Sequence, residues 1–118
     1  MNKKGLKIVY MGTPDFAVAP LQELVENNYN VVAVVTAPDR PAGRGKKIRI
    51  SAVKDYALAQ NLSILQPEKL KNPEFQAALE ELSPDLMVVV AFRMLPEVVW
   101  SLPSIGTFNL HASLLPQY

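Results

Sequence analysis

The sequence of 118 residues contains no cysteine and only one histidine. The lack of thiols excludes disulfide scaffolds, thiolate metal sites and cysteine nucleophiles, and it leaves the redox compartment undetermined. A single histidine is too few for a metal site built on imidazoles, so we expect no metal cofactor.

The sequence also lacks long apolar runs and a charge imbalance. No segment reaches the roughly 18 to 20 consecutive apolar residues that a membrane-spanning helix requires. Twelve Lys and Arg against eleven Asp and Glu give a formal net charge of +1, which is no general signature of nucleic-acid or membrane binding. We therefore expect a soluble, cytoplasmic protein that does not enter a membrane, with any charge signal confined to one segment.

The composition is that of an ordinary globular domain, with 49% hydrophobic and 19% charged residues. Three apolar runs rich in β-branched residues, 6–11, 30–36 and 85–92, predict strands. Their hydrophobicity is continuous rather than alternating, which indicates strands buried on both faces in a parallel sheet. Shorter strands are expected at 63–65 and 106–110.

Helices are predicted between these strands. Ser51 and Asn72 are suited to cap two of them, and Pro73 fits the first helical position after Asn72. A short helix at 95–102 carries Trp100, which we expect to be part of the core. The regular alternation predicts an α/β fold: a Rossmann-like, doubly wound, mainly parallel sheet with helices on both faces and ligands at the carboxyl ends of its strands.

The turn after the first strand contains a single glycine, Gly12, where a dinucleotide-binding protein would carry G-x-G-x-x-G. Dinucleotide binding, and with it an NAD-dependent oxidoreductase, is therefore disfavoured. The alternative is a tight strand-to-helix turn in which Thr13 caps the following helix.

A glycine-rich segment after the second strand, residues 39–47, concentrates positive charge and is expected to be a mobile loop. One interpretation is a solvated surface loop with no ligand. The other is a phosphate-binding segment, because the loop leaves the carboxyl end of a strand and its cations could position an anionic substrate there. The basic residues of this segment and its continuation are Arg40, Arg44, Lys46, Lys47 and Arg49.

The last predicted strand places Asn109 and His111 on the same side, because alternate residues of a strand face the same way. Asn109 could donate to a developing oxyanion while His111 moves a proton, which is the equipment of acyl transfer. A structural histidine near a strand end is the competing interpretation.

Three segments together, 12–16, 36–47 and 109–116, resemble the methionyl-tRNA formyltransferase family. The pattern Asn-x-His-x-Ser-Leu-Leu-Pro is shared by folate-dependent formyltransferases in general, and the basic loop indicates this member. The resemblance implies transfer of a formyl group from 10-formyltetrahydrofolate to the α-amine of methionyl initiator tRNA, as used in translation initiation.

The resemblance also implies roles for individual residues. Asn109 matches the asparagine that stabilises the tetrahedral oxyanion, and His111 matches the histidine that assists proton transfer. Arg44 is the strongest single candidate for tRNA binding. The residues matching the tRNA-binding loop are Arg40, Arg44, Lys46 and Lys47, and those matching the folate pocket are Phe92, Arg93, Met94, Leu95, Ser113, Leu114, Leu115 and Pro116.

A third catalytic group of the family, an aspartate, follows the Asn-x-His motif at a distance that this sequence does not reach. We therefore expect residues 1–118 to be the N-terminal part of the formyltransferase catalytic domain, without the rest of that domain or the C-terminal tRNA-binding domain, and to be inactive alone. The full-length protein is expected to be a monomer. The alternatives are a folate-dependent formyltransferase acting on a small amine, which would not need the basic loop, and a non-catalytic ligand-binding module.

Overall fold

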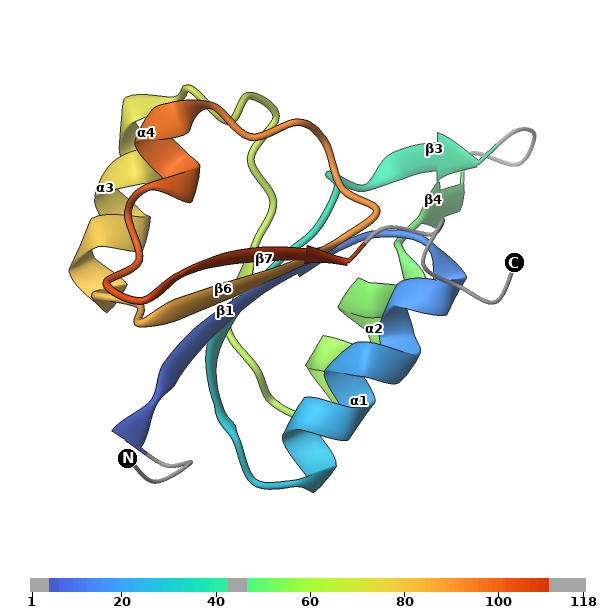
Figure 1. Cartoon of the computed structure of the whole chain (residues 1–118). Coiled ribbons are helices and arrows are strands. Elements are labelled where there is room, and N and C mark those ends of the chain that lie inside the picture. Colours follow the sequence, from blue (N-terminus) through green and yellow to red (C-terminus); the bar gives the residue numbers. More distant parts are fainter. Residues whose placement is uncertain (1–4, 43–46, 111–118) are drawn as a thin grey trace, which may run out of the picture.

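The computed structural model describes residues 5–42 and 47–110. These residues form a five-stranded sheet with helices on both faces, and a separate two-stranded hairpin projects from one end of it (Figure 1). The predicted α/β architecture is therefore confirmed.

The central sheet is entirely parallel and has the order β5-β2-β1-β6-β7. From β1 the chain proceeds outward through β2 and β5, and then returns to the other side of β1 with β6 and β7. The point where this direction reverses lies between β1 and β6, and in doubly wound sheets ligands bind outside the strand ends at such a point. The strands are β1 (Lys7–Gly12), β2 (Asn30–Val35), β5 (Ile64–Leu65), β6 (Leu86–Val90) and β7 (Gly106–Leu110).

Two helices cover each face of the sheet (Figure 1). On one face lie α1 (Val18–Glu26), preceded by the 3-10 turn η2 (Asp15–Ala17), and α2 (Ala52–Ala59). On the other face lie α3 (Pro73–Leu82) and α4 (Glu97–Trp100). None of the helices in the described part of the chain has the length and apolar character needed to cross a membrane.

Both predicted helix caps are present. The Ser51 hydroxyl accepts the Lys54 N–H at 3.0 Å, and the Asn72 side chain accepts the Glu74 N–H at 2.7 Å. Each bond satisfies a backbone donor that the first turn of a helix leaves without an intrahelical partner. These caps fix where α2 and α3 begin.

The core consists of two layers, one on each side of the sheet. Successive residues of β1 alternate between them: Ile8 and Tyr10 pack toward α1 and α2, and Val9 and Met11 toward α3 and α4. Each of these four side chains is at most 1% exposed, which explains why the run is continuously apolar. Burial raises the pKa of Tyr10, and its hydroxyl donates to the Ala17 carbonyl.

Two sequence expectations about the fold were wrong. The strand predicted to reach residue 92 ends at Val90, because Ala91 adopts a left-handed backbone with φ of 48°. Trp100 is 48% exposed rather than part of the core. The helix α4 has only four residues, so it presents a single fully buried side chain, Val99, to the sheet.

Candidate functional site

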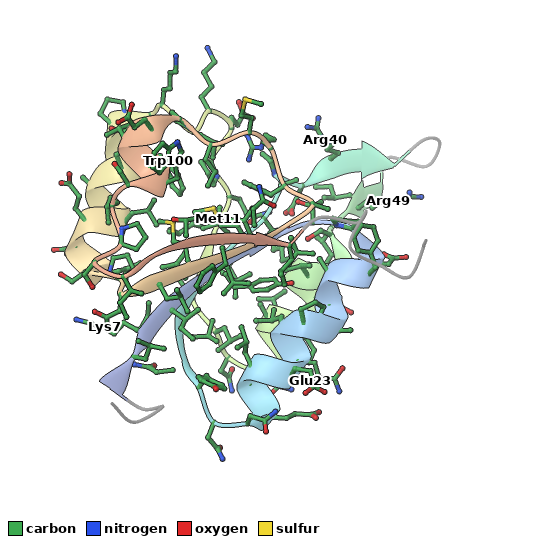
Figure 2. All side chains as sticks on the ribbon, viewed as in Figure 1. Lys7, Met11, Glu23, Arg40, Arg49 and Trp100 are labelled. Atoms are coloured by element: carbon green, nitrogen blue, oxygen red, sulfur yellow. The ribbon has the colours of Figure 1, made fainter. Side chains whose placement is uncertain are left out.

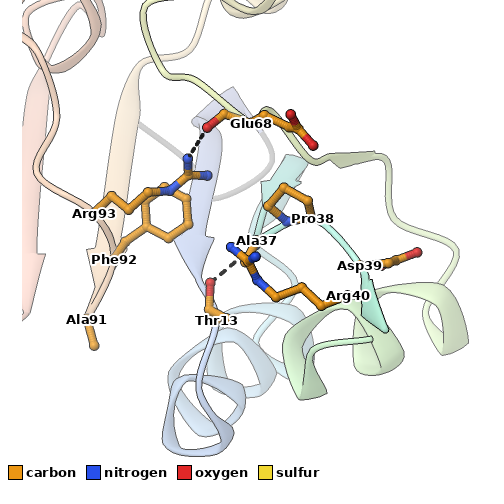
Figure 3. Close-up of a pocket in the computed structure, with 9 residues that line it drawn as sticks. All are labelled: Thr13, Ala37, Pro38, Asp39, Arg40, Glu68, Ala91, Phe92 and Arg93. Carbon is orange, nitrogen blue, oxygen red and sulfur yellow. Dashed lines mark hydrogen bonds between the residues drawn. The ribbon is translucent and has the colours of Figure 1, made fainter. Parts of the chain in front are cut away.

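A cleft lies over the carboxyl ends of four strands, at the predicted edge of the sheet (Figure 3). Its volume is about 650 Å³, and we call it the rim cleft. Its walls come from the segments that follow β1, β2, β5 and β6. The lining residues are Thr13, Ala37, Pro38, Asp39, Arg40, Glu68, Ala91, Phe92 and Arg93.

A second cleft of about 510 Å³ adjoins the rim cleft, and we call it the Asn109 cleft. Asn109 lies on β7 opposite Val89, and its exposed side chain contributes to the cleft wall. Apolar side chains form much of the remaining surface. The lining residues are Ala91, Phe92, Arg93, Met94, Leu95, Trp100, Thr107 and Asn109.

The two clefts share a wall of three residues, 91–93, which we call the partition. Arg93 fastens it: its guanidinium donates to the carbonyls of Glu68 and Pro67 at 2.8 and 2.9 Å, and it lies 4.9 Å from the ring centroid of Phe92. Burial, and secondarily the charge of Arg40, lower the pKa of Arg93. The loop after β6 is thereby held against the loop after β5.

The described ends of the basic segment pair as two short strands, where the sequence predicts only a loop, and we call this paired segment the hairpin. The prediction that the loop is mobile falls on residues 43–46, which lie outside the described residues. Strands β3 (Arg40–Ala42) and β4 (Lys47–Arg49) are antiparallel, with Arg40 opposite Arg49 and Ala42 opposite Lys47. Arg40 and Arg49 both lie at the base of this hairpin (Figure 2). No strand signal is present in this part of the sequence, because each strand is three residues long and contains charged residues or proline.

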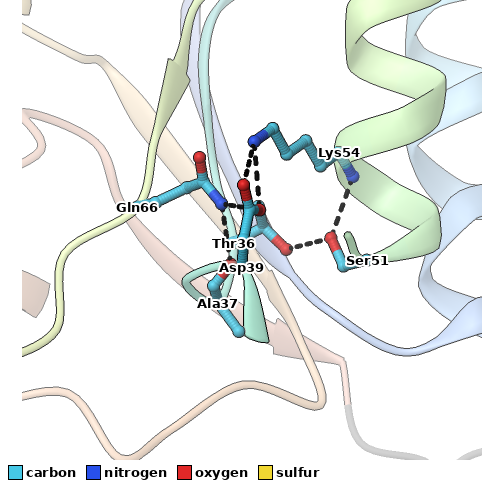
Figure 4. A network of polar contacts seen from close by, with 6 residues as sticks. All are labelled: Thr36, Ala37, Asp39, Ser51, Lys54 and Gln66. Carbon is cyan, nitrogen blue, oxygen red and sulfur yellow. Dashed lines mark hydrogen bonds and ion pairs between the residues drawn. The ribbon is translucent and has the colours of Figure 1, made fainter. Parts of the chain in front are cut away.

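A polar network holds the base of the hairpin (Figure 4). Lys54 donates to both carboxylate oxygens of Asp39, at 2.7 and 3.0 Å, and Gln66 donates to the same carboxylate at 2.7 Å. These two donors keep the pKa of Asp39 below its ordinary value. The hydroxyls of Thr36 and Ser51 lie 2.8 Å apart, so both ends of the hairpin segment are joined to the domain.

Thr13 does not cap a helix, contrary to the prediction. Its hydroxyl accepts the Ala37 N–H at 3.2 Å, so it joins the exits of β1 and β2. The preceding Gly12 is required by close packing: a Cβ at this position would lie 2.9 Å from the Ala17 Cβ and 3.2 Å from the Val90 carbonyl oxygen. The turn is thus shaped by tertiary contacts.

Several predicted site residues come together in the described structure. Phe92, Arg93, Met94 and Leu95 line one cleft with Asn109, and Arg40 lines the adjoining cleft. Lys47 lies in β4. The remaining candidates fall outside the described residues, and their roles stay predictions: Arg44, Lys46, His111, Ser113, Leu114, Leu115 and Pro116.

Sequence reasoning missed Trp100 and Thr107 in the Asn109 cleft, and Thr13 and Glu68 in the rim cleft. For Thr13 a signal was present, because it directly follows a strand at the ligand-binding edge. No group of three or more His, Asp or Glu side chains within residues 5–42 and 47–110 is placed to hold a metal ion.

Comparison with known proteins finds relatives among the formyl transferases. A family described as "Formyl transferase" matches residues 6–118. The methionyl-tRNA formyltransferase of Bacteroides thetaiotaomicron is 69% identical over 118 residues, covering 100% of this chain and 37% of the relative. The methionyl-tRNA formyltransferase of Bacteroides fragilis is 69% identical over 118 residues, covering 100% of this chain and 36% of the relative. That of Flavobacterium johnsoniae is 62% identical over 113 residues, covering 96% of this chain and 36% of the relative. The chain thus spans little more than a third of these curated relatives, and it belongs to the formyl transferase family.

Proposed function

We propose that this chain is the N-terminal part of the catalytic domain of a methionyl-tRNA formyltransferase, a monomeric enzyme of the cytoplasm. In this proposal the enzyme transfers a formyl group from 10-formyltetrahydrofolate to the α-amine of methionyl initiator tRNA. The observation that carries it is the Asn109 cleft: an amide donor beside apolar walls, at the carboxyl edge of the sheet, in a member of this family. The names of the relatives supply the acceptor.

The reaction needs little from the protein beyond orientation, an oxyanion donor and a proton carrier. The amine nitrogen attacks the formyl carbon, and the carbonyl oxygen becomes negatively charged. The Asn109 amide would donate a hydrogen bond to this oxygen, and His111 would take the proton that the attacking nitrogen loses. The carbon–nitrogen bond to the folate then breaks, and the proton goes to the leaving nitrogen.

The Asn109 cleft suits the folate donor. Its volume of about 510 Å³ falls within the range of small-molecule sites, and such sites combine apolar walls with few polar groups. Phe92, Leu95 and Trp100 offer apolar surface for a flat ring system. In this proposal Arg93, Met94 and the segment 113–116 complete the pocket.

The hairpin suits the RNA acceptor. Its basic residues Arg40, Arg44, Lys46 and Lys47 would contact phosphates, which gives affinity and orientation without sequence recognition. The network around Asp39 supports this role, because a fixed base directs the hairpin relative to the clefts.

The test is formylation of methionyl initiator tRNA by the full-length protein with 10-formyltetrahydrofolate as donor. We expect turnover in the unmodified protein, its loss in His111→Ala, and a raised KM for tRNA with kcat retained in Arg44→Ala. Lys71→Ala, an exposed basic residue before α3, serves as the control and is expected to leave both constants unchanged. A protein that ignores the tRNA but formylates a small amine would have a different acceptor, and one that formylates neither would refute the proposal.

A further inference from the structure

We propose that Met94 is an oxidation site, and that its conversion to methionine sulfoxide by a peroxide weakens binding of the formyl donor in the Asn109 cleft. The reactivity of this side chain is argued from its exposure alone. The effect on the donor rests on the proposed function, because that proposal places the folate in this cleft. The two parts are therefore tested by separate measurements.

Met94 differs from the other described methionines in its exposure. It is 93% exposed, whereas Met11 in β1 and Met87 in β6 are both 0% exposed. Those two pack in the core layer between the sheet and the helices α3 and α4. Met1 lies outside the described residues. Oxidation of a thioether requires access of the oxidant to the sulfur, so Met94 should react before Met11 and Met87.

The chemistry needs only a peroxide as the oxidant, for example hydrogen peroxide. The thioether sulfur attacks one peroxide oxygen, a sulfur–oxygen bond forms, and the oxygen–oxygen bond breaks. The sulfur loses two electrons, and the hydroxide that leaves takes the proton of the transferred oxygen and becomes water. No thiol within residues 1–118 competes for the oxidant, because this sequence contains no cysteine.

The position of Met94 connects its oxidation to ligand binding. Met94 lines the Asn109 cleft together with the apolar side chains of Phe92, Leu95 and Trp100. A thioether suits this wall, because sulfur is polarisable and packs favourably against aromatic rings. A sulfoxide is polar, and covering it with a ring system that offers no hydrogen bond costs free energy. Oxidation should therefore weaken binding of the donor.

The use of the RNA acceptor and the fold should be unaffected by this oxidation. Met94 belongs neither to the hairpin strands nor to the lining of the rim cleft. Because its side chain is exposed, the added oxygen disturbs no core packing, in contrast to oxidation of Met11 or Met87. The expected change is therefore confined to the donor.

The first experiment locates the oxidation. The full-length protein is treated with increasing concentrations of hydrogen peroxide, and its methionine-containing peptides are quantified by mass spectrometry. We expect sulfoxide at Met94 at concentrations that leave Met11 and Met87 unmodified. Equal oxidation of the three residues, or later oxidation of Met94, would overturn the site whatever the activity of the protein.

The second experiment measures formylation kinetics before and after the treatment that modifies Met94 but not Met11 or Met87. We expect the KM for 10-formyltetrahydrofolate to rise about tenfold, the effect of placing an unpaired polar group against the ligand. The KM for methionyl-tRNA and kcat should stay the same. A methionine sulfoxide reductase should restore the original KM for the donor. An unchanged KM for the donor after oxidation would overturn the proposed effect.

Met94→Leu distinguishes Met94 from every other group that peroxide modifies, and each protein is compared with its own untreated sample. Leucine is apolar and resists peroxide, so the KM of this variant for the donor should not respond to treatment. Met87→Leu is the matched control, a volume-conserving change in the core, and should respond like the unmodified protein. A response of Met94→Leu equal to that of Met87→Leu would overturn the proposal.

Failure of the proposed function has a different signature. An untreated full-length protein that formylates no acceptor would refute that function and with it the effect on the donor. The peptide measurement decides the oxidation site in either case, because it requires no turnover.

Discussion

The polar groups at the two ends of the central sheet differ in their hydrogen bonding. We call the edge where the parallel strands begin the amino-terminal rim and the edge where they end the carboxyl-terminal rim. At the amino-terminal rim Asp85 accepts the Lys7 N–H at 2.9 Å and the Ser104 hydroxyl at 3.0 Å, and its carbonyl accepts the Ile105 N–H at 2.8 Å. One aspartate thus joins the beginnings of β1, β6 and β7. At the carboxyl-terminal rim, by contrast, Asn109 and Arg40 line open clefts.

The difference indicates how one sheet can support both a stable fold and the proposed ligand site. Polar groups that hydrogen-bond to one another at a strand end hold the neighbouring strands in place. Polar groups that face a cleft keep their hydrogen-bonding capacity for a ligand. Substitutions at the two rims should therefore have separable effects, on stability at the amino-terminal rim and on catalysis at the carboxyl-terminal rim.

The largest expected effect is on catalysis, from Asn109→Ala. In the proposed mechanism this substitution removes the oxyanion donor, which should lower kcat by about 10²–10³-fold, with little change in the urea midpoint of unfolding. Steady-state formylation kinetics of the full-length protein measure this. Asn61→Gly is the control, because Asn61 lies in a left-handed turn with φ of 59° that glycine tolerates. A reduction in kcat below tenfold would mean that Asn109 is not the oxyanion donor.

Gly12→Ala is expected to be an exception to this division between the two rims. Gly12 lies at the carboxyl-terminal rim, but its substitution should lower stability because it disturbs packing. The added methyl group would meet Ala17 and the Val90 carbonyl at 2.9 and 3.2 Å, distances that force the turn to shift. We expect a loss of about 1–3 kcal/mol in the free energy of unfolding, the usual cost of overpacking. Urea denaturation followed by circular dichroism checks it, and an unchanged midpoint would contradict the packing seen here.

Trp100→Ala tests the apolar wall of the Asn109 cleft. Trp100 is half exposed, so its loss should affect stability little and donor binding more. We expect the KM for 10-formyltetrahydrofolate to rise about tenfold, the value of one aromatic contact. Val98→Ala is the matched control, since Val98 is equally exposed on the same helix but does not line the cleft. Equal effects from both variants would exclude a specific role for Trp100.

The smallest effect is expected at the amino-terminal rim, from Asp85→Asn. The Lys7 N–H and the Ser104 hydroxyl lower the pKa of Asp85 below its ordinary value of 3.8. A lowered carboxyl pKa contributes stability above pH 3.8 that is lost as the pH falls through the folded value. The variant should thus be less stable than the unmodified protein near neutral pH, and this difference should shrink in acid.

Thermal unfolding from pH 7 to pH 2 checks the Asp85 prediction, with turnover at pH 7 expected to be unaffected. Glu81→Gln, an exposed carboxylate on α3, is the control and should show no such pH dependence. A constant difference between Asp85→Asn and the unmodified protein across the range would show that the carboxylate charge is not involved.

Much of this architecture follows from the sequence because it depends on local patterns. The continuous apolar run of β1 and the caps at Ser51 and Asn72 each predict their element from a few neighbouring residues. The same holds for Asn109, which a strand at 106–110 places at the carboxyl edge. The clefts then follow from the topology.

The features that sequence reasoning missed depend on contacts between distant segments. Thr13 bonds to Ala37 after the next strand instead of to its own helix, and the left-handed Ala91 ends β6 two residues early. The hairpin is fixed by Asp39 reaching Lys54 and Gln66, neither of which has a local signal for it. Trp100 is apolar, but a helix of four residues has no second buried position for it.

The pairing of β1 has a consequence for synthesis on the ribosome. One edge of β1 pairs with β2, which follows soon in the sequence, whereas the other edge pairs with β6, which is synthesised much later. The hydrogen bond between Lys7 and Asp85 spans 78 positions of the sequence. During translation an apolar strand edge therefore remains open until β6 has emerged. Contacts of this range are slow to form and expose the nascent chain to misassociation. The partition follows β6 directly in the sequence, so neither cleft can form before β6 has been synthesised and has paired with β1.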